Sequence, residues 1–234
     1  MNQRGATQYT ADEGYTIDRW LLGLSGSKNA YVTVNSGYVT LHNETATSTS
    51  CTCRLYQQID NPGRFSNKTV TASVKLKNVT VSGAVSLLIY ANGTTRNVYF
   101  TSANANSIVS ATLTLPSDVA FMYVAVGASS NNGGKGNFDI EIESVKLELG
   151  SVSTLANDAP PKYSEQLLEC QRYFWKCAGY NAYTGYKSTT PYAFIQTPVL
   201  MRTTPTVTLG STNYIYGANG RAVFSGTNIV SSTQ

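Results

Sequence analysis

Val70-Thr71-Ala72-Ser73-Val74-Lys75-Leu76-Lys77 alternates apolar and polar side chains with a period of two. Successive side chains of a β-strand point to opposite faces, so this stretch predicts a strand with one buried and one solvated face. Similar runs surround it at short intervals, with turn residues between them. Asn92-Gly93 separates two of these runs and favours a tight β-hairpin. The pattern therefore predicts a mainly β fold class.

The neighbouring runs extend this pattern from residue 31 to residue 149. Val109–Leu115 alternates again, and Ala120–Ala128 is typical of a buried central strand because it is apolar nearly throughout. In Asp139–Leu149 the apolar positions switch from even to odd numbers, which predicts a β-bulge near Ser144. About eight to ten strands at this spacing predict an antiparallel jelly-roll sandwich over residues 1–150.

The sequence changes character after Gly150. Residues 151–162 are expected to form a linker, and residues 163–234 a small α+β C-terminal domain of one helix followed by short strands. We expect the helix to run from Ser164, its N-cap, to Gly179. Its apolar face would consist of Leu167, Cys170, Phe174 and Cys177.

The composition weakens several functional classes. Of 234 residues, 41% are hydrophobic and only 13% are charged, about half the usual charged share, which argues against disorder. The formal net charge is +4, and Lys and Arg are scattered singly, so we expect no nucleic-acid partner. The longest apolar run is far shorter than the roughly 18 residues of a membrane span. No secretory signal peptide is visible, so we expect synthesis in the cytosol and, for any release, a route such as lysis.

The four cysteines are expected to be reduced thiols, most of them buried. Cys51 and Cys53 share one face of a strand, which seldom gives good disulfide geometry. On a helix, Cys170 and Cys177 would be separated by roughly 10 Å, beyond the reach of a disulfide. This spacing, with a single histidine in the chain, is also poor for zinc.

The sequence contains no strong motif of a catalytic site, so we expect that the protein is not an enzyme. His42 is the only histidine, and we interpret it as a surface residue at the end of a strand. No nucleophile elbow, phosphate-binding loop or dinucleotide fingerprint occurs. Asp139, Glu141 and Glu143 share a strand face by alternation. We interpret this row as a solvated face; the alternatives are a structural calcium site at Asp139 and a hydrolytic carboxylate pair.

The tyrosines are more informative about function. Tyr180, Asn181, Tyr183 and Tyr186 lie in a stretch rich in Tyr, Gly, Asn and Thr. Such loops suit sugars, because tyrosine gives a large contact area at low entropic cost and amides adapt their hydrogen bonds. The alternative is that these tyrosines pack between the helix and the last strands, or across a subunit boundary. Trp20 is expected to anchor the core, with an aromatic sugar-binding platform as its alternative.

Three stretches resemble a module of phage and prophage tail-fibre or tail-tip proteins of gut bacteria. The first runs from Asn2-Gln3-Arg4-Gly5 to Gly14-Tyr15-Thr16-Ile17-Asp18-Arg19-Trp20. The second comprises Lys146-Leu147-Glu148-Leu149-Gly150-Ser151, Pro160-Pro161 and Cys170-Gln171-Arg172-Tyr173-Phe174. The third is Pro198-Val199-Leu200-Met201-Arg202-Thr203-Thr204-Pro205-Thr206-Val207.

This resemblance implies a jelly roll akin to carbohydrate-binding modules, then a small helix-plus-strand domain, at the host-facing end of a phage tail. It also implies a homotrimer, other tail proteins as partners, synthesis in the bacterial cytoplasm and a place in the virion tail. In that family a segment commonly precedes the Asn-Gln-Arg-Gly motif, whereas here Met1 stands directly before Asn2. We therefore expect the virion-attachment part to be missing here or to lie on another chain.

The sequence leaves three functional hypotheses open. The first is a non-enzymatic receptor-binding protein that holds a bacterial surface glycan and needs no cofactor, apart from the candidate calcium at Asp139. The second is a purely structural tail component in which Tyr183 and Tyr186 are buried between subunits. The third is a polysaccharide depolymerase that uses Asp139 or Glu141.

Overall fold

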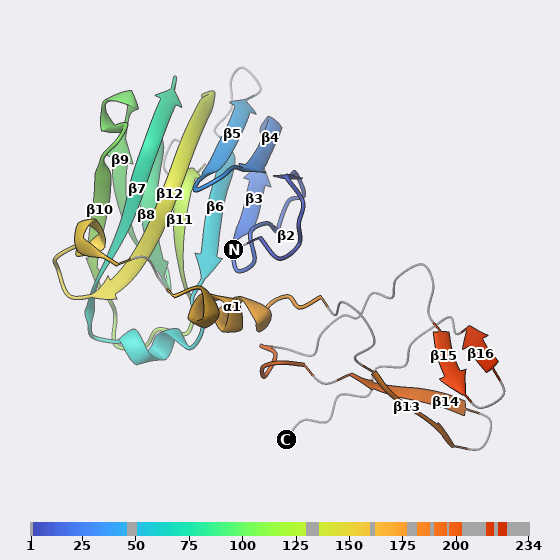
Figure 1. Ribbon diagram of the computed structural model, residues 1–234. Coiled ribbons are helices and arrows are strands. Elements are labelled where there is room, and N and C mark those ends of the chain that lie inside the picture. Colours follow the sequence, from blue (N-terminus) through green and yellow to red (C-terminus); the bar gives the residue numbers. More distant parts are fainter. Residues whose placement is uncertain are drawn as a thin grey trace. The chain divides into compact units, whose positions relative to one another are not determined.

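Figure 1 shows the computed structural model of the chain, which divides into two compact units, Met1–Lys162 and Tyr163–Gln234. The described residues are 2–45, 51–129, 136–159, 162–176, 182–187, 190–195, 197–202, 214–217 and 220–223, with the strands after residue 181 described as backbone only. The expected jelly-roll region and the expected linker both fall within the first unit.

The first unit is a sandwich of two antiparallel six-stranded sheets, whose layers are visible in Figure 1. In spatial order, sheet A consists of β1 (Gln8–Tyr9), β4 (Ser27–Val34), β5 (Val39–Thr45), β12 (Phe138–Leu149), β7 (Thr69–Val81) and β10 (Ile108–Thr114). Sheet B consists of β2 (Gly14–Tyr15), β3 (Leu21–Ser25), β6 (Thr52–Gln58), β11 (Met122–Ala128), β8 (Val85–Ala91) and β9 (Thr94–Phe100). Short 3-10 helices lie at η1 (Pro62–Phe65), η2 (Ser102–Asn104) and η4 (Leu155–Asn157). The predicted antiparallel jelly-roll sandwich is confirmed.

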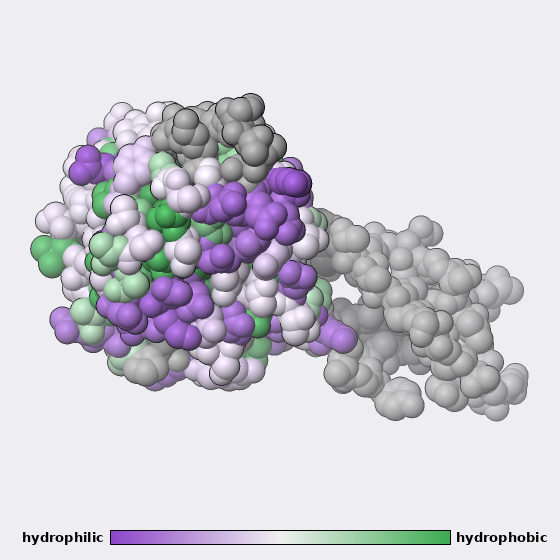
Figure 2. Space-filling view, turned by 90° about the horizontal axis from the view of Figure 1, so that it is seen from above, coloured by the Kyte–Doolittle hydropathy of each residue, from purple (hydrophilic) through white to green (hydrophobic). Residues whose placement is uncertain are grey.

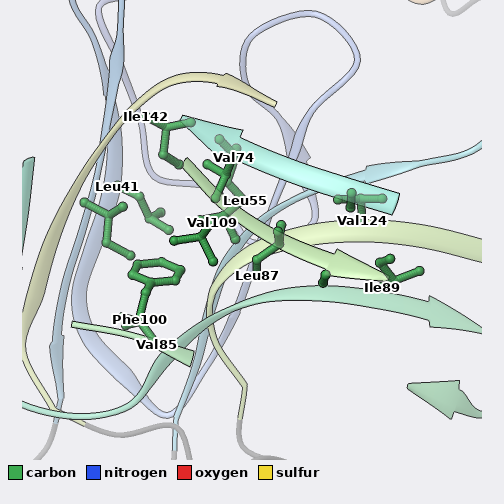
Figure 3. Close-up of a cluster of buried hydrophobic side chains, with 14 of the residues drawn as sticks. Leu41, Leu55, Val74, Val85, Leu87, Ile89, Phe100, Val109, Val124 and Ile142 are labelled. Atoms are coloured by element: carbon green, nitrogen blue, oxygen red, sulfur yellow. The ribbon is translucent and has the colours of Figure 1, made fainter. Parts of the chain in front are cut away.

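The hydrophobic core lies between the two sheets. The apolar residues of the β7 alternation, Val70, Ala72, Val74 and Leu76, are fully buried. Figure 3 shows one of them, Val74, beside Leu55 of sheet B. Full burial of such a side chain stabilises the fold by about 1.5–3 kcal/mol. Seen from above, the first unit presents mostly hydrophilic or neutral residues, with apolar ones in small patches (Figure 2).

The longest strand pair, β7 with β12, carries the predicted bulge. The register shifts between Ile142 and Ser144, which confirms the bulge near Ser144. A second shift occurs just before it, where the partners of Glu141 and Ile142 are Asn78 and Leu76. Because the two shifts have opposite sense, they compensate, and both strands keep apolar side chains toward the core on either side.

The β8–β9 connection is the predicted hairpin. Asn92 and Gly93 join the two strands with φ values of 45° and 85°. Positive φ at both central residues is the signature of a type I′ turn, which matches the right-handed twist of the flanking strands. The hairpin prediction is therefore confirmed.

The N-terminal motif quoted above ties the start of the chain to the sandwich. Asp18 is buried, and its carboxylate accepts a hydrogen bond from the backbone N–H of Gln3 at 3.1 Å. Arg4 donates to the backbone carbonyl of Asp18 at 3.2 Å, and its guanidinium lies over the ring of Tyr15. The residues of this motif therefore bind one another through hydrogen bonds and a cation–π contact, which is a structural role.

The segment after β12 is held against sheet A. The hydroxyl of Ser73 bonds that of Ser153 at 2.7 Å, and Lys146 bonds Thr154 at 2.6 Å and Asp158 at 2.5 Å. Glu148 accepts hydrogen bonds from the backbone and hydroxyl of Thr154 at 2.8 and 2.7 Å. We call Lys146, Glu148, Thr154 and Asp158 the clasp. At least the first part of the expected linker is therefore fixed by specific contacts.

The clasp makes the free energy of unfolding depend on pH in the acidic range. Burial raises the pKa of Glu148, but the hydrogen bonds from Thr154 and the charge of Lys146 outweigh it and hold this pKa below its ordinary value. The carboxylate therefore stabilises the fold above its unfolded pKa of about 4.3, and this contribution disappears as the pH falls through the lower folded-state pKa. We expect Glu148→Gln to show a shallower loss of unfolding free energy between roughly pH 5 and pH 3. Urea titrations across this range measure it, with Asp118→Asn as a control that removes one carboxylate elsewhere; equal slopes in the wild type and Glu148→Gln would contradict it.

The second unit contains α1 (Tyr163–Gln171) and two hairpins. The hairpin strands are β13 (Ala182–Lys187), β14 (Thr190–Ile195), β15 (Tyr214–Gly217) and β16 (Gly220–Val223). Among the described residues, no helix has the length and apolar character needed to cross a bilayer.

The predicted extent of the helix is wrong. It ends at Gln171, and the carbonyl of Cys170 accepts hydrogen bonds from the backbone N–H groups of both Tyr173 and Phe174 in a closing turn. Three consecutive aromatic residues follow Arg172, and aromatic residues are weaker helix formers than the residues before them. Ser164 also lies inside the helix, so it is not the N-cap. Cys177 and Gly179 lie outside the described residues.

Three cysteines are buried free thiols, as expected. These are Cys51, Cys53 and Cys170, and burial raises the pKa of the first two. A raised pKa keeps a thiol protonated and poorly nucleophilic at neutral pH. Cys51 and Cys53 therefore have a structural rather than a reactive role.

Candidate functional site

The central strand of sheet B is buried on both of its faces. All seven residues of β11 are buried, although sheet A covers only one side of sheet B. Val124 and Val126 point into the main core, whereas Tyr123 and Ala125 belong to a separate apolar cluster. Because alternate side chains of a strand point to opposite faces, this second cluster lies on the outer face of sheet B.

Aromatic side chains from three neighbouring strands form that cluster. The register pairs Tyr123 of β11 with Tyr90 of β8, and Ala125 with Tyr56 of β6. Tyr90 and Tyr123 stack with ring centroids 4.9 Å apart, and Tyr56 meets Tyr123 edge-on at 5.7 Å. Phe121 meets Tyr90 and Tyr123 edge-on at 6.0 and 5.8 Å. We call Tyr56, Tyr90, Phe121 and Tyr123 the tyrosine face.

Arg54 of β6 lies among these rings. Its Nη1 donates a hydrogen bond to the hydroxyl of Tyr123 at 2.9 Å. Its guanidinium carbon lies 4.8 Å from the ring centroid of Tyr123 and 5.2 Å from that of Tyr56. The hydroxyl of Tyr56 in turn donates to the carboxylate of Glu13. Cation–π contacts and hydrogen bonds therefore fix the orientation of the rings.

The electrostatics of the face favour neutral phenols. Burial raises the pKa of Tyr56, and the hydrogen bond and charge of Glu13 raise it further. Burial also raises the pKa of Tyr123, against the opposing effect of Arg54. Both phenols remain protonated at physiological pH, so both are hydrogen-bond donors and acceptors.

The tyrosine face has a buried base and an exposed rim. Tyr56 and Tyr123 are only 8% and 9% exposed, whereas Phe121 is 40% exposed. Tyr99 of β9, opposite Ser86 in the register, is 53% exposed. Next to Arg54 is a surface depression too small to hold a water molecule, lined by Arg54, Ser86, Leu88, Ala125, Gly127, Ala128 and Ser129. The arrangement offers flat apolar surfaces next to hydrogen-bonding groups, which suits binding of an amphipathic ligand.

None of the residues singled out from the sequence is among the four that define the tyrosine face. Tyr180 and Asn181 fall outside the described residues. Tyr183 and Tyr186 are on β13, opposite Phe194 and Pro191, and their side chains are outside the described part. Trp20 is partly buried and packs against the main core. Whether these residues bind sugar stays a prediction.

The acidic row on β12 is paired with basic or imidazole groups. Asp139 lies 2.7 Å from Nδ1 of His42, Glu141 3.8 Å from Lys77 and Glu143 2.6 Å from Lys75. Among the described residues, no group of three or more His, Cys, Asp or Glu side chains is arranged to hold a metal ion. Calcium at Asp139 stays a prediction.

The interpretation of His42 as a strand-end surface residue is wrong. His42 lies inside β5, and its side chain is only 16% exposed. Its ring stacks on Tyr31 with centroids 4.4 Å apart, because the register places the two residues directly opposite each other.

Sequence reasoning missed the tyrosine face, although a signal for it exists. The run around Tyr123 is apolar at both odd and even positions, while a two-layer sandwich needs only one apolar face per strand. Tyr56 and Tyr90 also occupy the positions that alternate with the core residues Leu55 and Ile89. An apolar outward face in a two-sheet protein indicates a contact surface.

Comparisons with known proteins give fold similarities at low identity. A family-model comparison and a curated-protein comparison find no match. Among solved structures, a CBM4 structure is similar over 61% of this chain and 94% of its own, with TM-score 0.43 and 18% identity. TmCBM61 in complex with β-1,4-galactotriose is similar over 56% and 88%, with TM-score 0.31 and 13% identity. The enzymatically active domain of bacteriophage CBA120 tailspike protein 4 is similar over 56% and 19%, with TM-score 0.37 and 14% identity.

Proposed function

We propose that the chain is a non-enzymatic binding protein whose tyrosine face holds a bacterial surface glycan. The observation that carries the proposal is an ordered set of aromatic rings on the outer face of sheet B, with Phe121 exposed at its rim. The C–H faces of sugars stack on aromatic rings, and sugar hydroxyls pair with phenol, amide and guanidinium groups. Fixed rings bind at low entropic cost, because little side-chain freedom is left to lose.

We further propose that this binding serves a phage tail fibre. Support comes from the sequence resemblance of the N-terminal, junction and C-terminal stretches to tail-fibre modules. A homotrimer would present three copies of the face, and linked copies raise avidity well beyond the affinity of one site. A virion tail is the proposed location, with other tail proteins as partners.

A hydrolytic function is less well supported. The carboxylates of Asp139, Glu141 and Glu143 face His42 or lysines on sheet A, while the aromatic rings lie on sheet B. Retaining and inverting glycosidases need two carboxyl groups that flank one bound sugar. The arrangement of these residues therefore favours binding over cleavage.

A glycan-binding assay tests the proposal. The full chain is offered a panel of extracted bacterial surface polysaccharides, and the double variant Phe121→Ala/Tyr99→Ala is compared with the wild type. We expect the variant to lose roughly tenfold in affinity, because two exposed ring contacts contribute about 0.5–1.5 kcal/mol each. Both side chains are well exposed, so the fold should be little affected.

Two further variants locate the site. Tyr163→Ala removes a tyrosine that is also well exposed, on α1, and should leave binding unchanged. Tyr183→Ala/Tyr186→Ala tests the stretch that the sequence favoured. Loss of binding only in this last variant would place the site in the second unit, and absence of binding by the wild type would overturn the proposal.

A further inference from the structure

Arg54 brings a positive charge that forms no ion pair into the tyrosine face. Among the described residues no carboxylate lies within ion-pair distance of its guanidinium. The nearby carboxylate of Glu13 accepts a hydrogen bond from the hydroxyl of Tyr56 instead. A cation at a largely apolar surface that makes no ion pair with the protein is a site of attraction for a ligand anion.

The hydrogen bonds of Arg54 leave one end of its guanidinium available. Nη1 donates to Tyr123, and Nε is buried without a partner. Nη2 makes no hydrogen bond to any described residue and is not among the fully buried unpartnered atoms, so part of it is accessible. Because the two rings fix the guanidinium plane, this donor is oriented before any ligand arrives.

The two cross-strand neighbours of Arg54 are glycines, Gly23 on β3 and Gly127 on β11. At Gly23 the space that a Cβ would need is taken by Arg54 itself, Tyr56 and Glu13. The adjoining depression is lined mainly by small residues, with Ser86 and Ser129 as further hydroxyl groups. A ligand carboxylate would therefore meet Nη2 at the surface of the sheet, with the hydroxyls of Ser86 and Ser129 on the rim of the same depression.

We propose that the tyrosine face selects glycans that carry carboxylates, with Arg54 as the residue that binds the carboxylate through Nη2. This inference rests on the proposed glycan-binding function and names the ligand class of the same face. The aromatic rings would contact the sugar ring, and Arg54 would distinguish acidic from neutral sugars. Charged hydrogen bonds of this kind are roughly twice as strong as neutral ones.

The test compares each panel polysaccharide as isolated and after chemical reduction of its carboxyl groups to alcohols. Carboxyl reduction removes the charge and keeps the sugar backbone. We expect it to weaken binding to the wild type about tenfold or more, an effect of at least one charged hydrogen bond. Arg54→Leu should weaken binding to the acidic form by a similar factor and should not weaken binding to the reduced form further.

Two variants separate charge from structure. Arg54→Lys retains the cation and should keep part of the preference for the acidic form. Tyr123→Phe removes the hydrogen bond to Nη1 but keeps Arg54, and should keep the preference. Thermal melts check that each variant is folded.

The outcomes distinguish this inference from the proposed function. If the wild type binds the reduced form as well as the acidic form, or binds only neutral polysaccharides, the inference is overturned and the glycan function stands. If Arg54→Leu weakens binding to both forms equally, Arg54 is a structural residue and the inference is also overturned. If the wild type binds no polysaccharide, both fail.

Discussion

Replacing Gly127 by alanine is expected to lower the free energy of unfolding by at least about 3 kcal/mol, a sum of backbone strain and overpacking. Gly127 lies in β11 with φ +135°, a conformation that residues with a side chain rarely adopt. A Cβ atom there would lie 2.3 Å from the carbonyl oxygen of Cys53 and 2.9 Å from Cα of Arg54. Both neighbours are backbone atoms of the paired strand β6, so the two strands would have to separate.

A matched glycine isolates the steric part of this effect. Gly93 also has positive φ, +85°, but no heavy atom lies within 4 Å of its ideal Cβ position. Gly93→Ala should therefore cost only about 1 kcal/mol, from backbone strain alone. Urea unfolding of both variants at 25 °C measures the difference. Equal losses would show that β6 and β11 are not as close at Gly127 as the structure places them.

The fold could be predicted largely because its core strands alternate in sequence. The β7 alternation, the Asn92-Gly93 hairpin and the bulge near Ser144 each depend on local pattern, and each is confirmed. The compensating shift between Asn78 and Leu76 was not predicted. In the sequence it is visible only as a change from even to odd apolar positions in β7. Whether such a change produces a register shift depends on the pairing with β12.

The tyrosine face is harder to predict, because it depends on pairing between distant segments. Tyr56, Tyr90 and Tyr123 come from three strands that are separated along the chain by entire other strands. Tyrosine suits a core, a surface and an interface about equally, so its position in a strand does not tell which of these it occupies. The tyrosine-rich stretch from Tyr180 to Tyr186 is conspicuous in the sequence instead, because its members are close together along the chain. Closeness in sequence is a poor guide on a sheet, where neighbours across strands make the surface.

Tyr123 connects every part of the tyrosine face, so its removal should affect both stability and binding. Its ring contacts Tyr56, Tyr90 and Phe121, and its hydroxyl accepts from Arg54. We expect Tyr123→Ala to lower the free energy of unfolding by about 3 kcal/mol, the lower end for loss of a buried aromatic ring. Glycan affinity should fall further than in Phe121→Ala/Tyr99→Ala, because Tyr90 and Arg54 both lose the surface that orients them.

Tyr123→Phe is the matched control, since it keeps the ring and removes only the hydroxyl. It should cost about 1.5 kcal/mol, the lower end for one hydrogen bond to a charged group. Urea unfolding and the polysaccharide assay measure both variants side by side. If Tyr123→Ala is as stable as Tyr123→Phe, the ring does not hold the cluster together. If Tyr123→Ala is folded and binds glycan as the wild type does, the rings of sheet B support the sandwich and the glycan contact lies on another surface.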